Sequence, residues 1–163
     1  MLAFAAACLG ATAALGQAQP GWAEFGPGVE VRLPPNYWGK LNADNRTLAV
    51  LADEHEAVQF TLALKSAGGA SRKSGEAAVR ELAKKMDLKV FESGGKLVLM
   101  EPRTQGTLDG RPSRNMRIHI GFDRWVVVMN LYVYEDQKDA PAVRQFFETD
   151  MDEVIRSIRK KRT

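Results

Sequence analysis

The segment from residue 116 to residue 134 constrains the fold more than any other part of this chain. Its first half has an apolar side chain at every second position: Met116, Ile118, Ile120 and Phe122. This alternation is typical of a strand with one buried face. A turn at Asp123 and Arg124 follows, and residues 125–134 carry apolar side chains at both odd and even positions, as in a central strand covered on both faces. The segment therefore predicts a long antiparallel hairpin within a sheet.

Shorter apolar patterns predict five more strands. They cover residues 29–33, 48–51, 58–65, 88–92 and 97–101. Gly94 and Gly95 separate the last two, and both can take the positive φ that a tight hairpin turn requires. Residues 102–112, which contain two prolines and two glycines, are expected to be a loop.

Two helices are also expected. The first begins near Ser74, whose hydroxyl can cap it, and has an apolar face made by Val79, Leu82, Ala83 and Met86. The second begins near Pro141 and is one long amphipathic helix with a stripe made by Val143, Phe147, Met151, Val154 and Ile158. The order βββ-α-ββββ-α, with hairpin-length connections, predicts an α+β fold: an antiparallel sheet of about six to seven strands packed with two main helices.

The start of the chain resembles an export signal. Residues 1–23 are rich in alanine and carry no charged side chain, and Gly16-Gln17-Ala18 followed by Pro20 looks like a cleavage site. We expect residues 1–19 to be an export signal or a disordered leader, and residues 20–163 to form a single domain. The expected location is the periplasm or the cell exterior.

Cys8, the only cysteine, lies inside this leader. The expected mature chain therefore has no disulfide, no thiol nucleophile and no thiolate metal ligand. Cys8 is also a candidate for lipidation, as in bacterial lipoproteins, and membrane attachment is expected only in that case.

The charge of the chain argues against nucleic-acid binding. The net charge is only +3, and acidic residues are spread among the basic ones. Basic residues cluster only at the end: Arg156, Arg159, Lys160, Lys161 and Arg162. We expect this cluster to lie in the last turn of the final helix, where cations interact favourably with the helix dipole, or to contact an acidic partner or an anionic lipid.

The sequence resembles the PsbP-like fold family. This fold is shared by a photosystem oxygen-evolving subunit, the DcrB-type bacterial envelope lipoproteins and a Ran-binding nuclear import factor. The resemblance is carried by residues 29–34 followed by Trp38, by Gly110-Arg111-Pro112 before a hairpin from Arg114 to Tyr134, and by a final helix running into Ile155-Arg156-Ser157-Ile158. It is strongest to the DcrB-type proteins, and it implies a binding or accessory role without a catalytic motif.

Catalytic and metal-binding motifs are weak in this chain. His55 and His119 are the only histidines, and His119 alternates with buried positions, so it is expected to face solvent; neither a metal site nor a cofactor is expected. Gly68-Gly69 before a helix resembles a phosphate-binding loop, but Ala67 and Arg72 stand where that loop requires glycine. A weaker site remains, in which the free amides at this helix start hold an anion with Arg72, Lys73 and Ser74.

A second candidate site is a basic patch on the predicted hairpin and its preceding loop. The candidate partner-binding residues are Arg103, Arg111, Arg114, Arg117, His119 and Arg124. An acidic partner protein or an anionic envelope ligand could dock there by electrostatic complementarity.

The expected function is therefore that of an exported, non-enzymatic binding or assembly accessory protein of the bacterial envelope. Its expected partner is an envelope protein or an anionic envelope ligand. Two alternatives remain open: a periplasmic immunity or inhibitor protein against a toxin or hydrolase, and an enzyme of unrecognised type.

Overall fold

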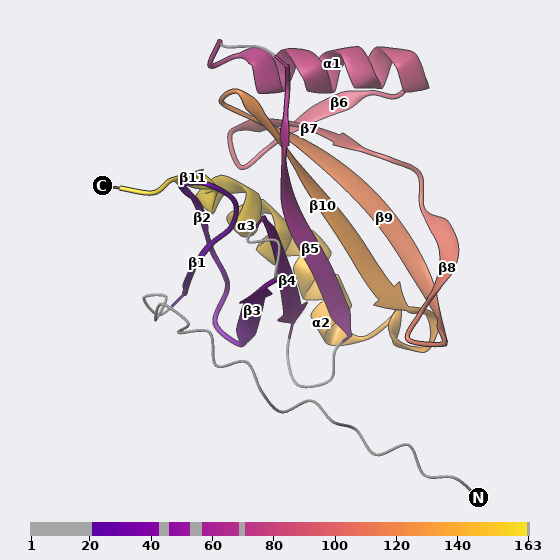
Figure 1. Cartoon of the computed structure of the whole chain (residues 1–163). Helices are drawn as coiled ribbons and strands as arrows, with labels where there is room; N and C mark the ends of the chain where they lie inside the picture. The colour runs from indigo at the N-terminus through magenta and orange to yellow at the C-terminus, as the bar shows by residue number, and fades with distance from the viewer. Residues whose placement is uncertain (1–20, 43–45, 53–56, 69–70, 163) are drawn as a thin grey trace, which may run out of the picture.

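The structure, a computed structural model, describes residues 21–42, 46–52, 57–68 and 71–162. Figure 1 shows a large sheet with helix α1 (Ser74–Met86) across one end and the C-terminal helices packed along it. The strand order of this sheet is β3-β4-β5-β10-β9-β7-β6, and β8 pairs with β9 outside that order. The strands are β3 (Tyr37–Leu41), β4 (Thr47–Ala52), β5 (Val58–Ser66), β6 (Val90–Ser93), β7 (Lys96–Met100), β8 (Thr104–Leu108), β9 (Arg111–Phe122) and β10 (Trp125–Tyr134).

A second, three-stranded sheet joins the two ends of the described chain. It consists of β1 (Trp22–Glu24), β2 (Val29–Arg32) and β11 (Arg159–Lys160), with β2 in the middle. Val29 and Val31 point into the main core, where β2 packs against the last helix. The Ser157 hydroxyl accepts a hydrogen bond from the Arg32 amide at 2.9 Å, which links this sheet to that helix.

The central hairpin is confirmed. Strand β10 lies between β5 and β9, and Phe122 is paired with Trp125 across the turn. Val127 and Val128 face opposite sides of the sheet, and both are buried. The main core, which contains Val127, is covered by the C-terminal helices, and a smaller core beneath α1 covers the other face.

Residues 102–112 do not form the expected loop. They contain β8 and the start of β9, joined by a two-residue turn at Asp109 and Gly110, which both have positive φ. Prolines at positions 102 and 112 suggested a loop, but Pro102 precedes β8, and Pro112 lies at the start of β9, before the residues that pair with β10, where a missing amide donor is tolerated.

The expected single C-terminal helix is interrupted. Helix α2 (Pro141–Gln145) leads into a π-helical turn, η2 (Phe146–Asp150), and then into α3 (Met151–Ser157). A π turn inserts one extra residue and rotates the rest of the helix about its axis. Phe146 is therefore fully buried in the core, whereas Phe147, which was expected on the apolar stripe, is only partly buried.

Two other local predictions are wrong, the second only in part. Ser74 is the first residue of α1 and makes no capping hydrogen bond; Lys73 occupies the N-cap position. Of the C-terminal basic cluster, Arg156 lies in the last turn of α3 as expected, but the helix ends at Ser157, and Arg159 and Lys160 form β11 instead.

The expected fold class is confirmed. The protein is α+β, with a large antiparallel sheet of eight strands rather than six to seven, a small sheet, and helices on both faces of the large one. Within the described residues, no helix is both long and apolar enough to span a bilayer.

Candidate functional site

A cavity of about 330 Å³ opens between α2 and the end of the β9–β10 hairpin that carries Tyr134. We call it the α2 cavity. Its floor consists of buried apolar side chains: Met116, Leu131, Val133 and Val143. Its rim consists mainly of polar and charged side chains: Arg103, Arg114, Asn115, Lys138, Asp139 and Arg144, with Phe147 beside them.

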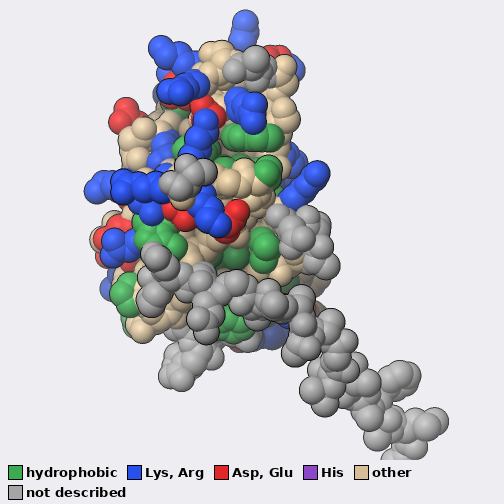
Figure 2. Space-filling model, turned by 60° about the vertical axis from the view of Figure 1, so that its left-hand side comes forward, with side chains coloured by type: hydrophobic (Ala, Val, Ile, Leu, Met, Phe, Trp, Pro, Cys, Tyr) green, Lys and Arg blue, Asp and Glu red, His purple; other side chains and the backbone are tan. Residues whose placement is uncertain are grey.

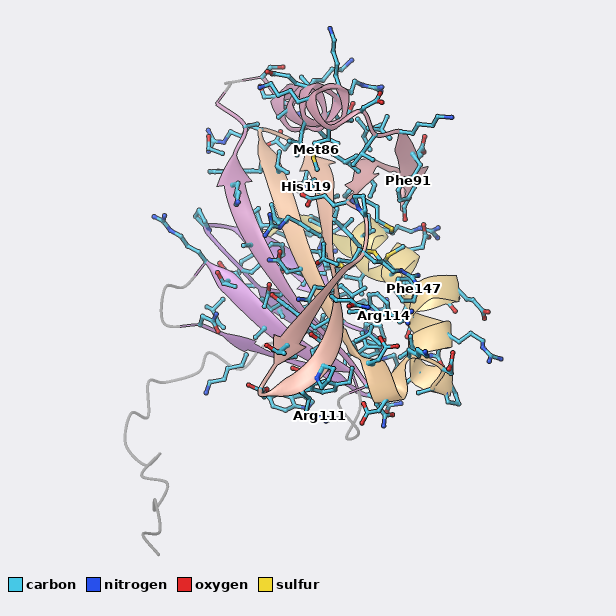
Figure 3. All side chains as sticks on the ribbon, turned by 90° about the vertical axis from the view of Figure 1, so that its right-hand side faces the viewer. Met86, Phe91, Arg111, Arg114, His119 and Phe147 are labelled. Carbon is cyan, nitrogen blue, oxygen red and sulfur yellow. The ribbon has the colours of Figure 1, made fainter. Side chains whose placement is uncertain are left out.

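Strand pairing places Arg114 at the end of the apolar floor. Met116 lies opposite Leu131, and Arg114 lies opposite Val133, in the antiparallel register of β9 and β10. Residues two apart on a strand share a face, so Arg114 and Met116 both face the C-terminal helices. Figure 3 shows Arg114 beside Phe147, between the strands and those helices.

The π turn places Phe147 at the cavity. Phe146 points into the core, where its ring lies 5.6 Å from that of Phe60. The Phe147 ring stands edge-on to Phe146, with centroids 5.5 Å apart, and lines the cavity. The Arg103 guanidinium lies 5.4 Å from the centre of the Phe147 ring, within the range of a cation–π contact.

The rim carries an excess of positive charge. Arg114 donates two hydrogen bonds to the Glu135 carboxylate, at 2.5 and 2.7 Å, and Lys138 donates one at 3.0 Å. The hydrogen bond from Arg114, followed by that from Lys138, lowers the pKa of Glu135 to about 2. Glu135 is therefore ionised at neutral pH and neutralises part of this charge. Among the described residues, neither Arg103 nor Arg144 has a carboxylate partner.

The predicted basic patch is only partly assembled. Arg103 and Arg114 meet at the α2 cavity. Arg111 lies at the same end of the hairpin, 3.7 Å from the centre of the Tyr134 ring, and its Nη2 donates to both carboxylate oxygens of Asp136, at 2.9 and 3.0 Å.

The rest of the predicted patch lies elsewhere. Arg117 is on the opposite face of β9, where it donates to the Asn130 side-chain oxygen at 3.0 Å. Arg124 lies at the far end of the hairpin, 5.2 Å from the Trp125 ring. The prediction of one continuous patch is wrong because Arg117 faces the opposite side of the sheet from Arg114, and Arg124 lies at the other end of the hairpin.

His119 does not face solvent, contrary to expectation. Its side chain is largely buried, and Nε2 lies 2.6 Å from a carboxylate oxygen of Glu101. His119 is paired with Leu99 and Val128 on the sheet face that α1 covers. In Figure 3 it lies beneath the end of α1 that carries Met86. The described residues contain no group of three His, Cys, Asp or Glu side chains placed to hold a metal ion.

The predicted anion site at the start of α1 is wrong in its main feature. The amides of Ser74, Gly75 and Ala77 already donate to carbonyls of Ser71, Asp123 and Lys73, at 3.0, 2.9 and 3.0 Å. They are not free to bind an anion. The Arg72 side chain instead lines a separate cleft, and Lys73 is exposed. Cys8 and His55 lie outside the described residues.

Sequence reasoning missed Lys138, Asp139, Arg144 and Phe147. They come from the segment between β10 and the π turn, which carries no recognisable binding motif. Adjacent phenylalanines at 146 and 147 were the one available signal, because a continuous helix cannot bury both on one narrow stripe.

No protein-family model matches this sequence, and no curated protein matches it. Among solved structures, a protein of Bacteroides thetaiotaomicron is similar, with a TM-score of 0.64 and 13% identity over 88% of this chain; the chain spans 50% of that protein's length. The Ran-binding protein Mog1p of Saccharomyces cerevisiae has a TM-score of 0.44 and 12% identity, over 82% of this chain and 90% of its own. The cyanobacterial PsbP of Synechocystis sp. PCC 6803 has a TM-score of 0.35 and 11% identity, over 89% of this chain and 95% of its own. The likeness to the Bacteroides protein is one of fold alone, and the finer resemblance to DcrB-type proteins stays a prediction.

Proposed function

We propose that this protein is an exported, non-enzymatic binding protein of the bacterial envelope, and that it binds an amphipathic anion in the α2 cavity. The observation that carries this proposal is the contrast within the cavity. Buried Met116, Leu131 and Val133 form an apolar floor, and Arg103 and Arg144 stand beside it without carboxylate partners among the described residues. An apolar group and an adjoining carboxylate or phosphate complement this arrangement.

The size and composition of the cavity support a binding role. Ligand cavities in proteins begin at about 300 Å³ and combine an apolar lining with a few polar groups. Among the described residues, no serine, cysteine or histidine lines the cavity; its polar side chains are Asn115, Asp139 and the basic residues of the rim. This lining therefore favours binding over acyl transfer to a serine or cysteine nucleophile.

The binding free energy has two expected sources. Burial of apolar surface contributes about 25 cal/mol for each Å² removed from water. A charge-assisted hydrogen bond from Arg103 or Arg144 to the anion contributes about 1.5 kcal/mol, or about tenfold in affinity.

The test uses a fluorescent amphipathic anion, 1-anilinonaphthalene-8-sulfonate, with the full chain. We expect decanoate to displace the probe, and decyltrimethylammonium, which has an equally long chain and a positive head, not to do so. Arg103→Gln with Arg144→Gln is expected to weaken the probe and decanoate by at least about tenfold. The matched control is Arg80→Gln with Lys84→Gln, which removes two exposed charges from α1 and is expected to change neither affinity.

Equal displacement of the probe by decanoate and decyltrimethylammonium, or equal affinities of the two double variants, would reject the proposal.

A protein partner could supply the same chemistry, in the form of an apolar side chain between acidic residues. A peptide with leucine between two glutamates therefore serves as a second competitor. If the peptide displaces the probe and decanoate does not, the ligand is a segment of a partner protein, as the accessory and immunity roles require.

Export is tested separately. The full chain with a C-terminal tag is expressed in a Gram-negative bacterium and recovered from the periplasmic fraction. We expect intact-mass measurement to show loss of residues 1–19. Recovery of the uncleaved chain in the cytoplasmic fraction would contradict this part of the proposal and leave the ligand test unaffected.

A further inference from the structure

A second cleft, of about 460 Å³, lies at the opposite end of the β9–β10 hairpin from the α2 cavity. We call it the basic cleft. Its walls come from the segment before α1, the β6–β7 turn, the β9–β10 turn and the C-terminal strand β11. Its charged side chains are Arg72, Glu76, Lys96, Asp123, Arg159 and Lys160. Figure 2, which brings the left side of Figure 1 forward, shows Lys and Arg side chains gathered on the upper half of this face.

Two of the cations have partners and two do not. Lys160 is 2.7 Å from the Asp123 carboxylate, and Arg159 is 2.7 Å from that of Glu30. Arg72 and Lys96 have no carboxylate within ion-pair distance among the described residues; Lys96 donates instead to the Arg156 carbonyl at 3.1 Å. Arg72 attracts Asp123 from a longer range, and Glu76 is the other carboxylate of the lining. The basic cleft therefore has four cations against two carboxylates, and its two cations without ion pairs stand on separate elements.

Lys96 lies in a partly buried environment with a second cation, Arg156, beside it. Burial, followed by repulsion from Arg156, lowers the pKa of Lys96, and Asp152 offsets this only in part. Asp152 is already engaged, because it accepts from the Gly94 amide at 2.7 Å, from the Ser93 hydroxyl at 2.9 Å and from Arg156 at 2.6 Å. An anion bound in the cleft beside Lys96 would offset the repulsion between Lys96 and Arg156.

We propose that the basic cleft binds the phosphate of an anionic lipid headgroup and docks this face of the protein on an anionic membrane surface. Arginine and lysine both donate to phosphate oxygens, and Arg72 can do so with a planar fork. The cleft is open, and Arg72 is exposed, so a single free anion would be held weakly in water. A membrane surface instead engages several cations at once. Two more exposed cations are available for this: Lys73, which follows Arg72, and Arg162, two positions after Lys160.

The test measures flotation of the full chain with vesicles of phosphatidylcholine alone and of phosphatidylcholine mixed with phosphatidylglycerol. We expect binding to the mixed vesicles only, with a strong dependence on salt. Each cation near the membrane surface contributes about fivefold to the binding affinity. The double variant Arg72→Gln with Lys96→Gln is therefore expected to bind about 25-fold more weakly. Arg80→Gln with Lys84→Gln removes the same charge from α1 away from the cleft and is expected to leave binding nearly unchanged.

Any binding through residues 1–19 is common to both double variants, so the difference between them reports the cleft alone. Circular dichroism confirms that both variants are folded. Equal binding to the two kinds of vesicle, or equal loss in the two double variants, would overturn the proposal.

Two further probes separate the sources of the anion. Inorganic phosphate is the first probe. If it binds saturably, if the cleft variant weakens that binding, and if the protein does not float with vesicles, the cleft binds a free ion and membrane docking is overturned. Polyglutamate is the second probe. If it binds as tightly as the mixed vesicles do, and the cleft variant weakens that binding, the cleft binds an acidic protein and the proposal is also overturned. Neither outcome depends on the α2 cavity, because the residues of the two sites do not overlap.

Discussion

The Asp152 carboxylate on α3 accepts a hydrogen bond at 2.7 Å from the backbone amide of Gly94, 58 positions earlier in the chain. The same oxygen accepts from the Ser93 hydroxyl at 2.9 Å, so one side chain ties the β6–β7 turn to the C-terminal helix. Gly94 has a positive φ and packs directly against the Arg156 backbone, which leaves no room for a Cβ. The turn and the helix therefore form one structural unit.

Replacing Asp152 by alanine is expected to lower the free energy of unfolding by about 1–2 kcal/mol. The variant loses the charged acceptor of three hydrogen bonds, from Gly94, Ser93 and Arg156, and removes the partner of the Gly94 amide. Urea denaturation monitored by circular dichroism measures the change. Glu153→Ala, which alters the exposed neighbouring residue, is the control and is expected to change stability by less than about 0.5 kcal/mol. Equal effects of the two substitutions would show that the Asp152 contacts contribute nothing.

Stability is expected to fall on acidification, in part through Asp152. The Gly94 amide, followed by the Ser93 hydroxyl, lowers the pKa of Asp152 below its usual 3.8. The unfolded chain therefore takes up a proton at higher pH than the folded protein, so this stabilisation is present above about pH 5 and is lost as the pH falls through the lowered pKa. Urea midpoints at pH 6 and pH 3 measure the loss. Asp152→Ala is expected to lose less than the wild-type protein over this range, and an identical loss would contradict the assignment.

The π turn predicts different effects for two adjacent phenylalanines. Phe146→Ala is expected to lower the free energy of unfolding by about 3–5 kcal/mol, because the ring is fully buried. Phe147→Ala is expected to cost far less stability and to weaken binding of the fluorescent anion, because Phe147 lines the α2 cavity. Thermal denaturation and probe titration measure both effects. A larger loss of stability for Phe147 would favour an uninterrupted helix.

The central position of β10 is tested by Val127→Asp. Val127 is fully buried, so the substitution places an unpaired charge in the core, and we expect a loss of more than about 4 kcal/mol or failure to fold. Gln105→Asp adds the same side chain at an exposed position of β8 and is expected to change stability by less than about 0.5 kcal/mol. A soluble Val127→Asp protein that unfolds cooperatively at the wild-type temperature would contradict the placement of this strand.

Several elements were predictable because their signals are local. Alternating apolar residues identified β5 and most of β9, and a run that is apolar at both odd and even positions identified β10. The two glycines at 94 and 95 identified the β6–β7 turn. Short strands with few apolar side chains were missed: β1, β3, β8 and β11. Their formation depends on a neighbouring strand that offers free amides and carbonyls, which a pattern within one segment does not reveal.

The candidate sites were less predictable than the fold. The predicted patch grouped four arginines that are close in sequence. The structure brings Arg103 and Arg114 together, but it places Arg117 on the other face of the sheet and Arg124 at the far end of the hairpin. The expectation that His119 faces solvent ignored α1, which covers that face of the sheet.

The sequence by itself determined the antiparallel α+β class, the central hairpin and the first helix, because periodicity and turn residues act over a few neighbouring positions. Only the tertiary structure decided the two candidate sites. The C-terminal helices enclosed the α2 cavity beside Arg114, the π turn rotated Phe147 toward it, and the C-terminal strand brought Lys160 to within 2.7 Å of Asp123. These outcomes depend on which distant segments pack together, and that is settled by the burial of the whole apolar surface rather than by any one stretch of sequence.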